Sequence, residues 1–306
     1  MPSLQSRFLR FFIRNVNLFD LTGIPLAEMR RKTDLAAWLL RTPGGVSVRK
    51  ETAGTVPGEW IVPKDAPPDR ALLYFHGGGF IFGSLSTHRA LVARLAIAAG
   101  ARAFSVDYQL APEHPFPAAV EDCLEAYRGL LRIGFSPQRI VVGGDSAGGN
   151  LALVLLLALR QAGEPLPAAA VCLSPVTDLV FTGDSFQSKA DIDPIFPRVT
   201  SQSLSSRIGS GYIGSEDPRQ PLISPLFADL RGLPPVLLHV GEDEILLDDS
   251  ERLGERVRGA GGQATVVVWG KMWHVFQVFA PFVPEANRSI EQNGEFIKEK
   301  QKGEIL

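Results

Sequence analysis

RIVVGGDSAGGNLALVLLLAL, residues 139–159, reads as a strand, a tight turn and a helix in one short stretch. A run of β-branched residues ends at Gly143, and the apolar run that follows Asn150 is long enough for a buried helix. Between them, Gly144, Ser146 and Gly148 form the pattern G-x-S-x-G, which holds a serine at a sharp strand-to-helix turn with its hydroxyl exposed. We therefore predict that Ser146 is a nucleophile. The alternative is a plain glycine-rich turn whose serine caps the helix.

The alternation of strand and helix extends along most of the chain. Helical patterns occupy about 87–99, 118–133, 147–161, 248–261 and 284–300. Short β-rich runs predict eight strands, at 46–51, 59–62, 71–75, 102–106, 140–143, 169–173, 235–240 and 264–269. This order is typical of an α/β fold with a mostly parallel sheet flanked by helices. Reactive groups are expected in the loops at the carboxyl ends of the strands.

Two segments interrupt the alternation. Residues 1–42 read as one or two amphipathic helices, and about 178–222 form an irregular stretch rich in Pro and Gly. We expect both segments to cap the carboxyl edge of a single catalytic domain that spans residues 43–306. The alternative for the first segment is a basic amphipathic helix that packs on the surface or touches membranes.

Composition limits the classes of function. The 306 residues are 45% hydrophobic with a net charge of −2, and the 31 basic residues are spread along the chain, so nucleic-acid binding is not expected. Cys123 and Cys172 lie in apolar patterns, which predicts buried thiols in a reducing, cytoplasmic setting and excludes a metal site made of cysteines. The N-terminal arginines interrupt any signal-like apolar run, and 151–159 is too short to span a bilayer, so no stable membrane insertion is expected.

A serine nucleophile needs a base and an acid that follow it in the order serine, acid, histidine for this type of turn. Of the five histidines, His239 and His274 follow Ser146. His239 lies inside a predicted strand, where a packed core residue is expected. His274 lies in the loop after the last strand, and we predict that it is the base.

The acid is expected in the loop VLLHVGEDEILLDD, which begins with the penultimate strand. Asp243 follows that strand directly and is predicted to accept the Nδ1 proton of His274. Spacing alone does not separate it from Glu242 or Glu244, and the later acids at 248 and 249 could cap the next helix. The alternative for the whole cluster is a solvated acidic loop.

The stretch HGGGF, residues 76–80, follows the third predicted strand. The three glycines at 77–79 place no Cβ near the backbone, so the N–H groups of Gly77, Gly78 and Gly79 are candidates to approach a developing oxyanion. The N–H of Ala147, after the nucleophile, supplies another donor. His76 is expected to anchor this loop. A flexible loop without function is the alternative.

Three motifs together resemble the hormone-sensitive lipase family of α/β-hydrolases, in particular its bacterial esterases with a G-D-S-A-G turn. The motifs are HGGGF at 76–80, DYQLAPEHPFP at 107–117 and GDSAGGN at 144–150. The resemblance implies an eight-stranded sheet with a helical cap, no cofactor or metal, a triad of Ser146, Asp243 and His274, and oxyanion donors at Gly78, Gly79 and Ala147. The family commonly has Asp-Pro-Leu where this chain has Asp243-Glu244-Ile245.

The resemblance also implies hydrolysis of short- to medium-chain acyl esters, a small-molecule ester substrate, and homodimers paired at the edge of the sheet. An amidase, a carbamate hydrolase or a lactonase could use the same triad, and a non-catalytic small-molecule receptor could share the fold. Five candidates are expected to line the substrate pocket: Phe80, Phe82, Phe181, Ile213 and Val275.

Overall fold

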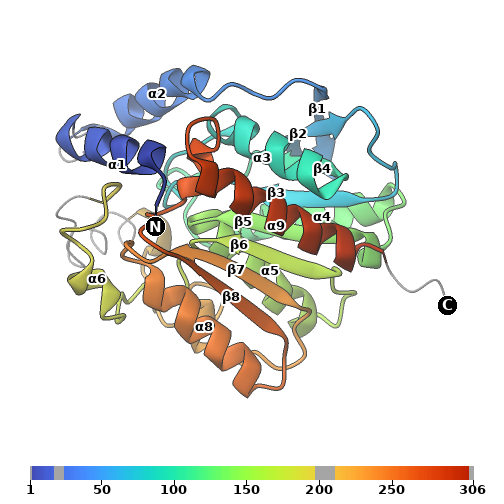
Figure 1. The fold of residues 1–306 in the computed structure, drawn as a ribbon. Coiled ribbons are helices and arrows are strands. Elements are labelled where there is room, and N and C mark those ends of the chain that lie inside the picture. Colours follow the sequence, from blue (N-terminus) through green and yellow to red (C-terminus); the bar gives the residue numbers. More distant parts are fainter. Residues whose placement is uncertain (1, 17–23, 197–210, 303–306) are drawn as a thin grey trace.

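The centre of the molecule is one eight-stranded sheet, shown in a computed structural model that describes residues 2–16, 24–196 and 211–302 (Figure 1). The strand order is β1-β2-β4-β3-β5-β6-β7-β8. The first two pairings, β1 with β2 and β2 with β4, are antiparallel, and all the others are parallel. The strands are β1 (Val46–Ala53), β2 (Val56–Pro63), β3 (Ala71–Phe75), β4 (Arg102–Val106), β5 (Ile140–Asp145), β6 (Ala169–Leu173), β7 (Val236–Gly241) and β8 (Ala264–Trp269). The predicted α/β class with eight strands is confirmed.

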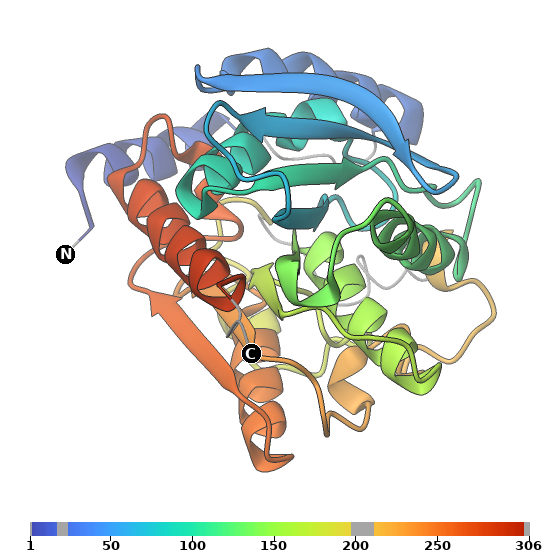
Figure 2. The ribbon, with the colours of Figure 1, turned by 90° about the vertical axis from the view of Figure 1, so that its right-hand side faces the viewer.

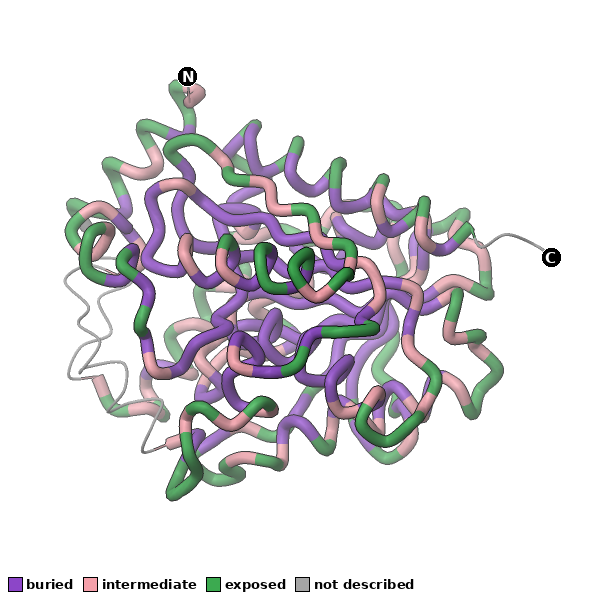
Figure 3. The backbone as a smooth tube through the Cα atoms, turned by 90° about the horizontal axis from the view of Figure 1, so that it is seen from below, coloured by how far each residue is buried: buried purple, intermediate pink, exposed green. Residues whose placement is uncertain are grey.

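Helices cover both faces of the sheet, so β3, β5, β6 and β7 are buried along their whole length. On one face, α3 (Leu85–Ala99) packs against α9 (Pro284–Lys300). The other face carries α4 (Ala118–Arg132), α5 (Ala147–Gln161) and α8 (Leu247–Gly259) (Figure 2). The buried backbone accordingly runs through the middle of the molecule, with exposed residues on the outer sides of the helices (Figure 3).

The N-terminal segment forms α1 (Leu4–Val16), α2 (Leu26–Ala36) and the short helix η1 (Ala37–Leu39). The helices α1 and α2 lie on the same side of the molecule as α6 (Ser185–Ser188) of the insertion (Figure 1). Ser6 and Ile13 of α1 are buried, whereas Leu4, Phe8 and Phe11 are exposed, so this helix leaves several large apolar side chains in solvent. The rest of the predicted cap insertion includes 197–210, which lie outside the described residues.

Two expectations from composition can be compared with the described residues. Cys123 and Cys172 are both buried and unpaired, as predicted. Within the described ranges, no helix is long and apolar enough to cross a membrane. Further short helices within the described ranges include η2 (Pro137–Arg139), η4 (Pro225–Phe227) and η5 (Phe276–Phe279).

Candidate active site

Ser146 lies at the turn between β5 and α5 with φ 52° and ψ −116°. A positive φ is unfavourable for a residue with a Cβ, and such strain persists only where the surroundings fix it. Here the Ser146 N–H donates to the Leu173 carbonyl (2.9 Å), and the Val176 N–H donates to the Ser146 carbonyl (3.2 Å). Gly148 lets the first turn of α5 approach β3, because a Cβ there would collide with the Phe75 carbonyl oxygen. The turn therefore has the geometry that G-x-S-x-G predicts.

Asp145, directly before the serine, is a buried anchor for the neighbouring loops. Its carboxylate accepts hydrogen bonds from the Tyr74 hydroxyl (2.8 Å), the Gly77 N–H (3.1 Å) and His88 Nε2 (3.2 Å). Burial alone would raise the pKa of Asp145, but the charge and hydrogen bond of His88 and the bond from Tyr74 lower it. No local pattern in the sequence pointed to Asp145 or His88, because their pairing joins β5 to α3.

The glycine loop is held open by its backbone conformation. Gly78 has φ 120° and Gly79 has φ 59°, a region that favours glycine. Among the described residues, no acceptor is bonded to the N–H groups of Gly78, Gly79 or Ala147. The candidate role of Gly77 is corrected, because its N–H already donates to Asp145. These three remaining N–H groups are therefore available to a ligand.

His76 is packed inside the molecule, as expected for an anchor of the glycine loop. Its ring stacks on Tyr108 with centroids 4.3 Å apart, and its Nδ1 lies 2.8 Å from the Gly77 carbonyl oxygen, to which it donates. Burial, aided by the positive charge of His88, lowers the pKa of His76 to about 4. The imidazole is thus neutral near pH 7.

His274 is buried and pairs with a carboxylate, but the partner is Glu244. Nδ1 of His274 lies 3.2 Å from Glu244 Oε1, and a carboxylate can only accept, so Nδ1 carries the proton. Glu244 Oε2 accepts from the Gly241 N–H (2.7 Å) and the Ser174 hydroxyl (2.8 Å). Burial lowers the pKa of His274, yet the hydrogen bond and charge of Glu244 outweigh burial and raise it.

The expectation that Asp243 receives the Nδ1 proton of His274 is therefore wrong. The Asp243 side chain faces α1, where Arg10 Nη1 lies 2.6 Å from Oδ2. Lys271 and Lys189 lie 3.7 Å and 3.8 Å from Oδ1. Neighbouring side chains in this tight turn point to different sides, so Asp243 faces α1 while Glu244 faces His274. The arginine that holds Asp243 is 233 residues away in sequence, beyond any local pattern.

The loop after β6 lies between the serine and the histidine. Leu173 and Val176 hydrogen bond to the Ser146 backbone. Ser174, which lies between them in sequence, bonds to Glu244 and to the residue after His274. The Ser174 hydroxyl donates to Glu244 Oε2 and accepts from the Val275 N–H (3.1 Å). One loop thus connects the backbone at Ser146 to the Glu244–His274 pair.

A second carboxylate lies near this pair. Asp193, in the insertion, is buried and accepts from the N–H groups of Ile195 (2.9 Å) and Ile245 (3.2 Å). Burial chiefly raises the pKa of Asp193 to about 7, with the charge of Glu244 adding to it and that of His274 opposing it. Phe196 from the same segment packs on His274 with ring centroids 4.8 Å apart.

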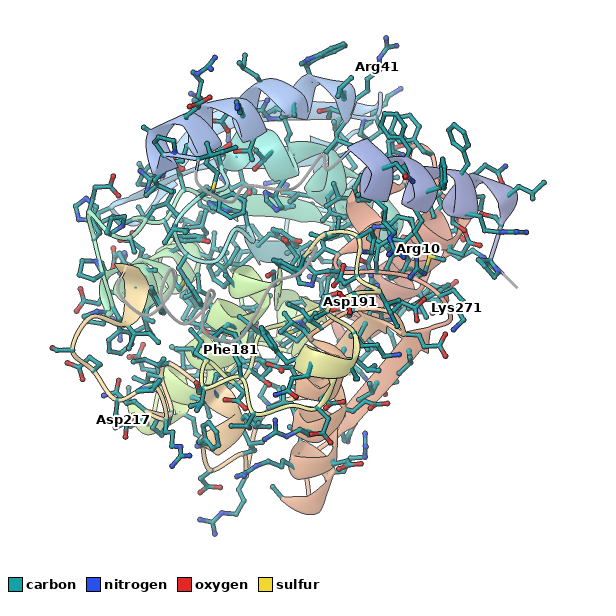
Figure 4. The ribbon with its side chains drawn as sticks, turned by 90° about the vertical axis from the view of Figure 1, so that its left-hand side faces the viewer. Arg10, Arg41, Phe181, Asp191, Asp217 and Lys271 are labelled. Atoms are coloured by element: carbon teal, nitrogen blue, oxygen red, sulfur yellow. The ribbon has the colours of Figure 1, made fainter. Side chains whose placement is uncertain are left out.

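The predicted pocket residues occupy different environments. Phe80 is fully buried in the hydrophobic core and stacks on Tyr212 with centroids 3.8 Å apart. Phe181 packs on Phe186 at the insertion (Figure 4). Of the other three, Ile213 and Val275 are buried and Phe82 is half-buried. Their role in binding substrate stays a prediction.

The other histidine after Ser146 is a core residue, as the sequence predicted. His239 is buried in β7 and its Nδ1 contacts Ser289 (2.8 Å), Asn293 (3.1 Å) and Trp269 Nε1 (3.1 Å). Burial lowers its pKa to about 3.

A serine at the turn after β5, with a histidine–carboxylate pair after β8 and β7, defines the class of α/β-hydrolases. The family model for the alpha/beta hydrolase fold matches residues 72–278. The chain belongs to this family, and within it to the bacterial hormone-sensitive lipase group of esterases. It is an enzyme that hydrolyses carboxylic esters.

Three similar proteins support this placement. An acetyl-hydrolase of Streptomyces hygroscopicus is 43% identical over 81% of each chain. A crystal structure of an esterase from the bacterial hormone-sensitive lipase family is 42% identical with a TM-score of 0.92, covering 98% of this chain and 99% of that one. The crystal structure of EstE5 soaked with p-nitrophenyl butyrate is 38% identical with a TM-score of 0.92, covering 98% of this chain and 100% of that one.

Proposed function

We propose that this esterase hydrolyses short- to medium-chain acyl esters through a Ser146–His274–Glu244 triad and an acyl-enzyme intermediate. The observation that carries the proposal is the loop after β6. It bonds the backbone of Ser146 and also the Glu244–His274 pair, so nucleophile, base and acid share one connected support. Glu244 takes the place that the family resemblance assigned to Asp243.

In the proposed first step, His274 takes the Ser146 proton on Nε2 as the serine oxygen attacks the ester carbonyl carbon. Glu244, bonded to Nδ1, fixes the tautomer and stabilises the imidazolium that forms. The imidazolium then protonates the leaving alcohol. Water deprotonated by the same imidazole attacks the acyl-enzyme, and the carboxylic acid departs as Ser146 regains its proton.

The oxyanion formed in both steps needs hydrogen-bond donors. We assign this role to the N–H groups of Gly78, Gly79 and Ala147, which have no acceptor among the described residues. Ala147 is also the first residue of α5, where the helix dipole favours negative charge. One such donor is worth about 2.7–4 kcal/mol of transition-state stabilisation.

The substrate is proposed to enter beneath a cap formed by residues 1–42 and 178–222. The aromatic ring of Phe196 against His274 limits room beside the base. From the family resemblance, we propose acyl chains of roughly C2 to C8. Butyrate, the acyl group of the compound soaked into EstE5, falls in this range. Phe80, Phe82, Phe181, Ile213 and Val275 remain the candidates for the pocket wall.

Initial rates on p-nitrophenyl acetate, butyrate, octanoate and palmitate, with Ser146→Ala in parallel, test the proposal. We expect the shorter esters to react fastest and the variant to lose at least about three orders of magnitude. Equal rates in both proteins, or fastest turnover of palmitate, would contradict it. The rate on a matched butyramide distinguishes an esterase from an amidase, because an amidase would hydrolyse the amide faster than the ester.

We also propose a cellular location and an oligomeric state for the enzyme. A cytoplasmic location is supported by the two unpaired, buried thiols. Homodimers are proposed to pair at β8, which forms one edge of the sheet and exposes Val268. Sedimentation of wild type beside Val268→Lys tests the dimer, and a monomeric wild type would contradict it.

A further inference from the structure

Arg10 of α1 lies where the cap helix meets the loops of the candidate active site (Figure 4). Its guanidinium is largely buried, with 18% of the side chain exposed. Nη1 donates to Asp243 Oδ2 (2.6 Å) and to the Lys271 carbonyl (3.1 Å), and Nη2 donates to the Ile192 carbonyl (3.0 Å). A planar fork of this kind fixes the relative positions of the groups it binds.

Each of the three residues that Arg10 contacts is close in sequence either to His274 or to a carboxylate near it. Asp243 precedes Glu244, the carboxylate bonded to Nδ1. Lys271 begins the turn that leads to His274, and the Lys271 N–H is itself held by Glu242 (3.0 Å). Ile192 precedes Asp193, whose carboxylate bonds the Ile245 N–H next to Glu244. One side chain therefore contacts the acid loop, the histidine loop and the insertion.

We propose that Arg10 is a positioning residue, which holds Asp243 toward α1 and sets the geometry of the two loops so that Glu244 serves His274. The inference rests on the proposed triad. The Asp243 side chain is only 6% exposed, and without Arg10 its ion-pair partners would be the two more distant lysines, Lys189 and Lys271. Lys189 and Lys271 lie farther from it, so Arg10 is its closest cation.

The same helix offers a matched control. Arg7 lies one turn before Arg10 and is exposed, and its side chain makes no hydrogen bond or ion pair with the described residues. Arg7→Gln and Arg10→Gln remove the same charge from the same helix. They differ in whether the contact with the catalytic loops is lost.

The experiment measures kcat and KM on p-nitrophenyl butyrate, with rates expressed per active site titrated by a fluorophosphonate. Arg10→Gln is expected to lower kcat by about 10- to 100-fold, because small displacements of catalytic groups have effects of this size. KM should change by less than about twofold, and Arg7→Gln should match wild type. Arg10→Lys should give an intermediate kcat, since an ammonium reaches Asp243 without the fork.

A double-mutant cycle with Asp243→Asn tests whether the two residues act together. We expect the double variant to be no slower than Arg10→Gln alone, because the first change already removes the shared contact. Additive losses would overturn the pairing.

Two further outcomes overturn the inference. In the first, Arg10→Gln has the same kcat as Arg7→Gln. In the second, Arg10→Gln lowers the melting temperature and the titrated fraction but leaves kcat per site unchanged, which indicates a purely structural contact. Ser146→Ala serves as a separate arm: if it retains activity, the proposed triad fails, whereas its inactivity beside an unaffected Arg10→Gln overturns only the role of Arg10.

Discussion

The three consecutive acids after β7 form hydrogen bonds with three different residues, and only one of these residues is His274. Glu242 accepts from the Lys271 N–H, Asp243 pairs with Arg10, and Glu244 bonds His274. Glu244 is fully buried and its second oxygen is also bonded, so its carboxylate has little freedom to turn. A carboxylate that is held on both oxygens is suited to fix a histidine tautomer.

Glu244→Gln is expected to lower kcat about 10³- to 10⁴-fold, because an amide favours the wrong imidazole tautomer. Asp243→Asn should lower kcat by about tenfold, since it acts only through loop geometry. Both rates are measured on p-nitrophenyl butyrate after active-site titration. If Asp243→Asn were the more damaging of the two, the assignment of Glu244 would be wrong.

The pH dependence of kcat/KM reports on His274. The base must be neutral to accept the Ser146 proton, and Glu244 raises the pKa of His274 above its ordinary value despite burial. Activity should therefore fall as pH drops through this raised pKa, with a midpoint above about 6.5. In Glu244→Gln, the midpoint of the pH profile of the residual activity should shift to lower pH. A midpoint that does not move would show that the carboxylate does not interact with the base.

The candidates Ser146 and His274 could be singled out from the sequence because each follows a recognisable pattern. Ser146 lies in a motif with a strand before it and a helix after it, and His274 is separated from His239 by its place in a loop. Glu244 could be named only as an alternative to Asp243. Asp243 contacts Arg10 and Glu244 contacts Ser174, which are distant in sequence, and no local pattern encodes those contacts.

At the scale of elements, long apolar runs predicted the sheet well. Strands β3, β4, β6 and β8 begin and end at the predicted residues, and each is followed by a polar residue or a glycine. The hairpin of β1 and β2 extends farther than predicted, to Ala53 and from Val56, because its pairing continues through residues of weak strand propensity. The insertion carried no periodic signal, and the short α6 within it was not predicted.

The contact of α5 with β3 at the nucleophile turn depends on Gly148. In Gly148→Ala the new Cβ would meet the Phe75 carbonyl, and overpacking of this kind costs about 1–3 kcal/mol. We expect a lower urea midpoint and a loss of activity.

Gly259→Ala is the control for this prediction. Gly259 is exposed at the end of α8, and a Cβ added there would meet no neighbouring atom of the described residues within 4 Å. Alanine at this position should be neutral or stabilise by up to about 1 kcal/mol. A Gly148→Ala protein as stable as Gly259→Ala would show that the close approach at the turn is not required.

At the scale of the whole molecule, the core extends across the sheet and includes both thiols. Cys123 of α4 and Cys172 of β6 belong to the same hydrophobic cluster, although they lie on different elements. Burial raises the pKa of each thiol, which further lowers its reactivity. The sequence predicted this burial from apolar neighbours alone.

Thiol titration with an aromatic disulfide reagent tests this packing. We expect neither cysteine to react in the native enzyme and both to react in guanidinium chloride. Circular dichroism under the same conditions gives the unfolding transition as a control. Rapid reaction of either thiol well below that transition would contradict the packing of α4 and β6 in one core.

The measurement that tests the central claim most directly is peptide mapping after reaction with a fluorophosphonate, which captures an activated serine. The proposed triad predicts one adduct per chain, on the peptide that contains Ser146, with loss of esterase activity in proportion to labelling. Ser146→Ala should give no adduct. An adduct on another residue, or esterase activity that survives complete labelling of Ser146, would contradict the account.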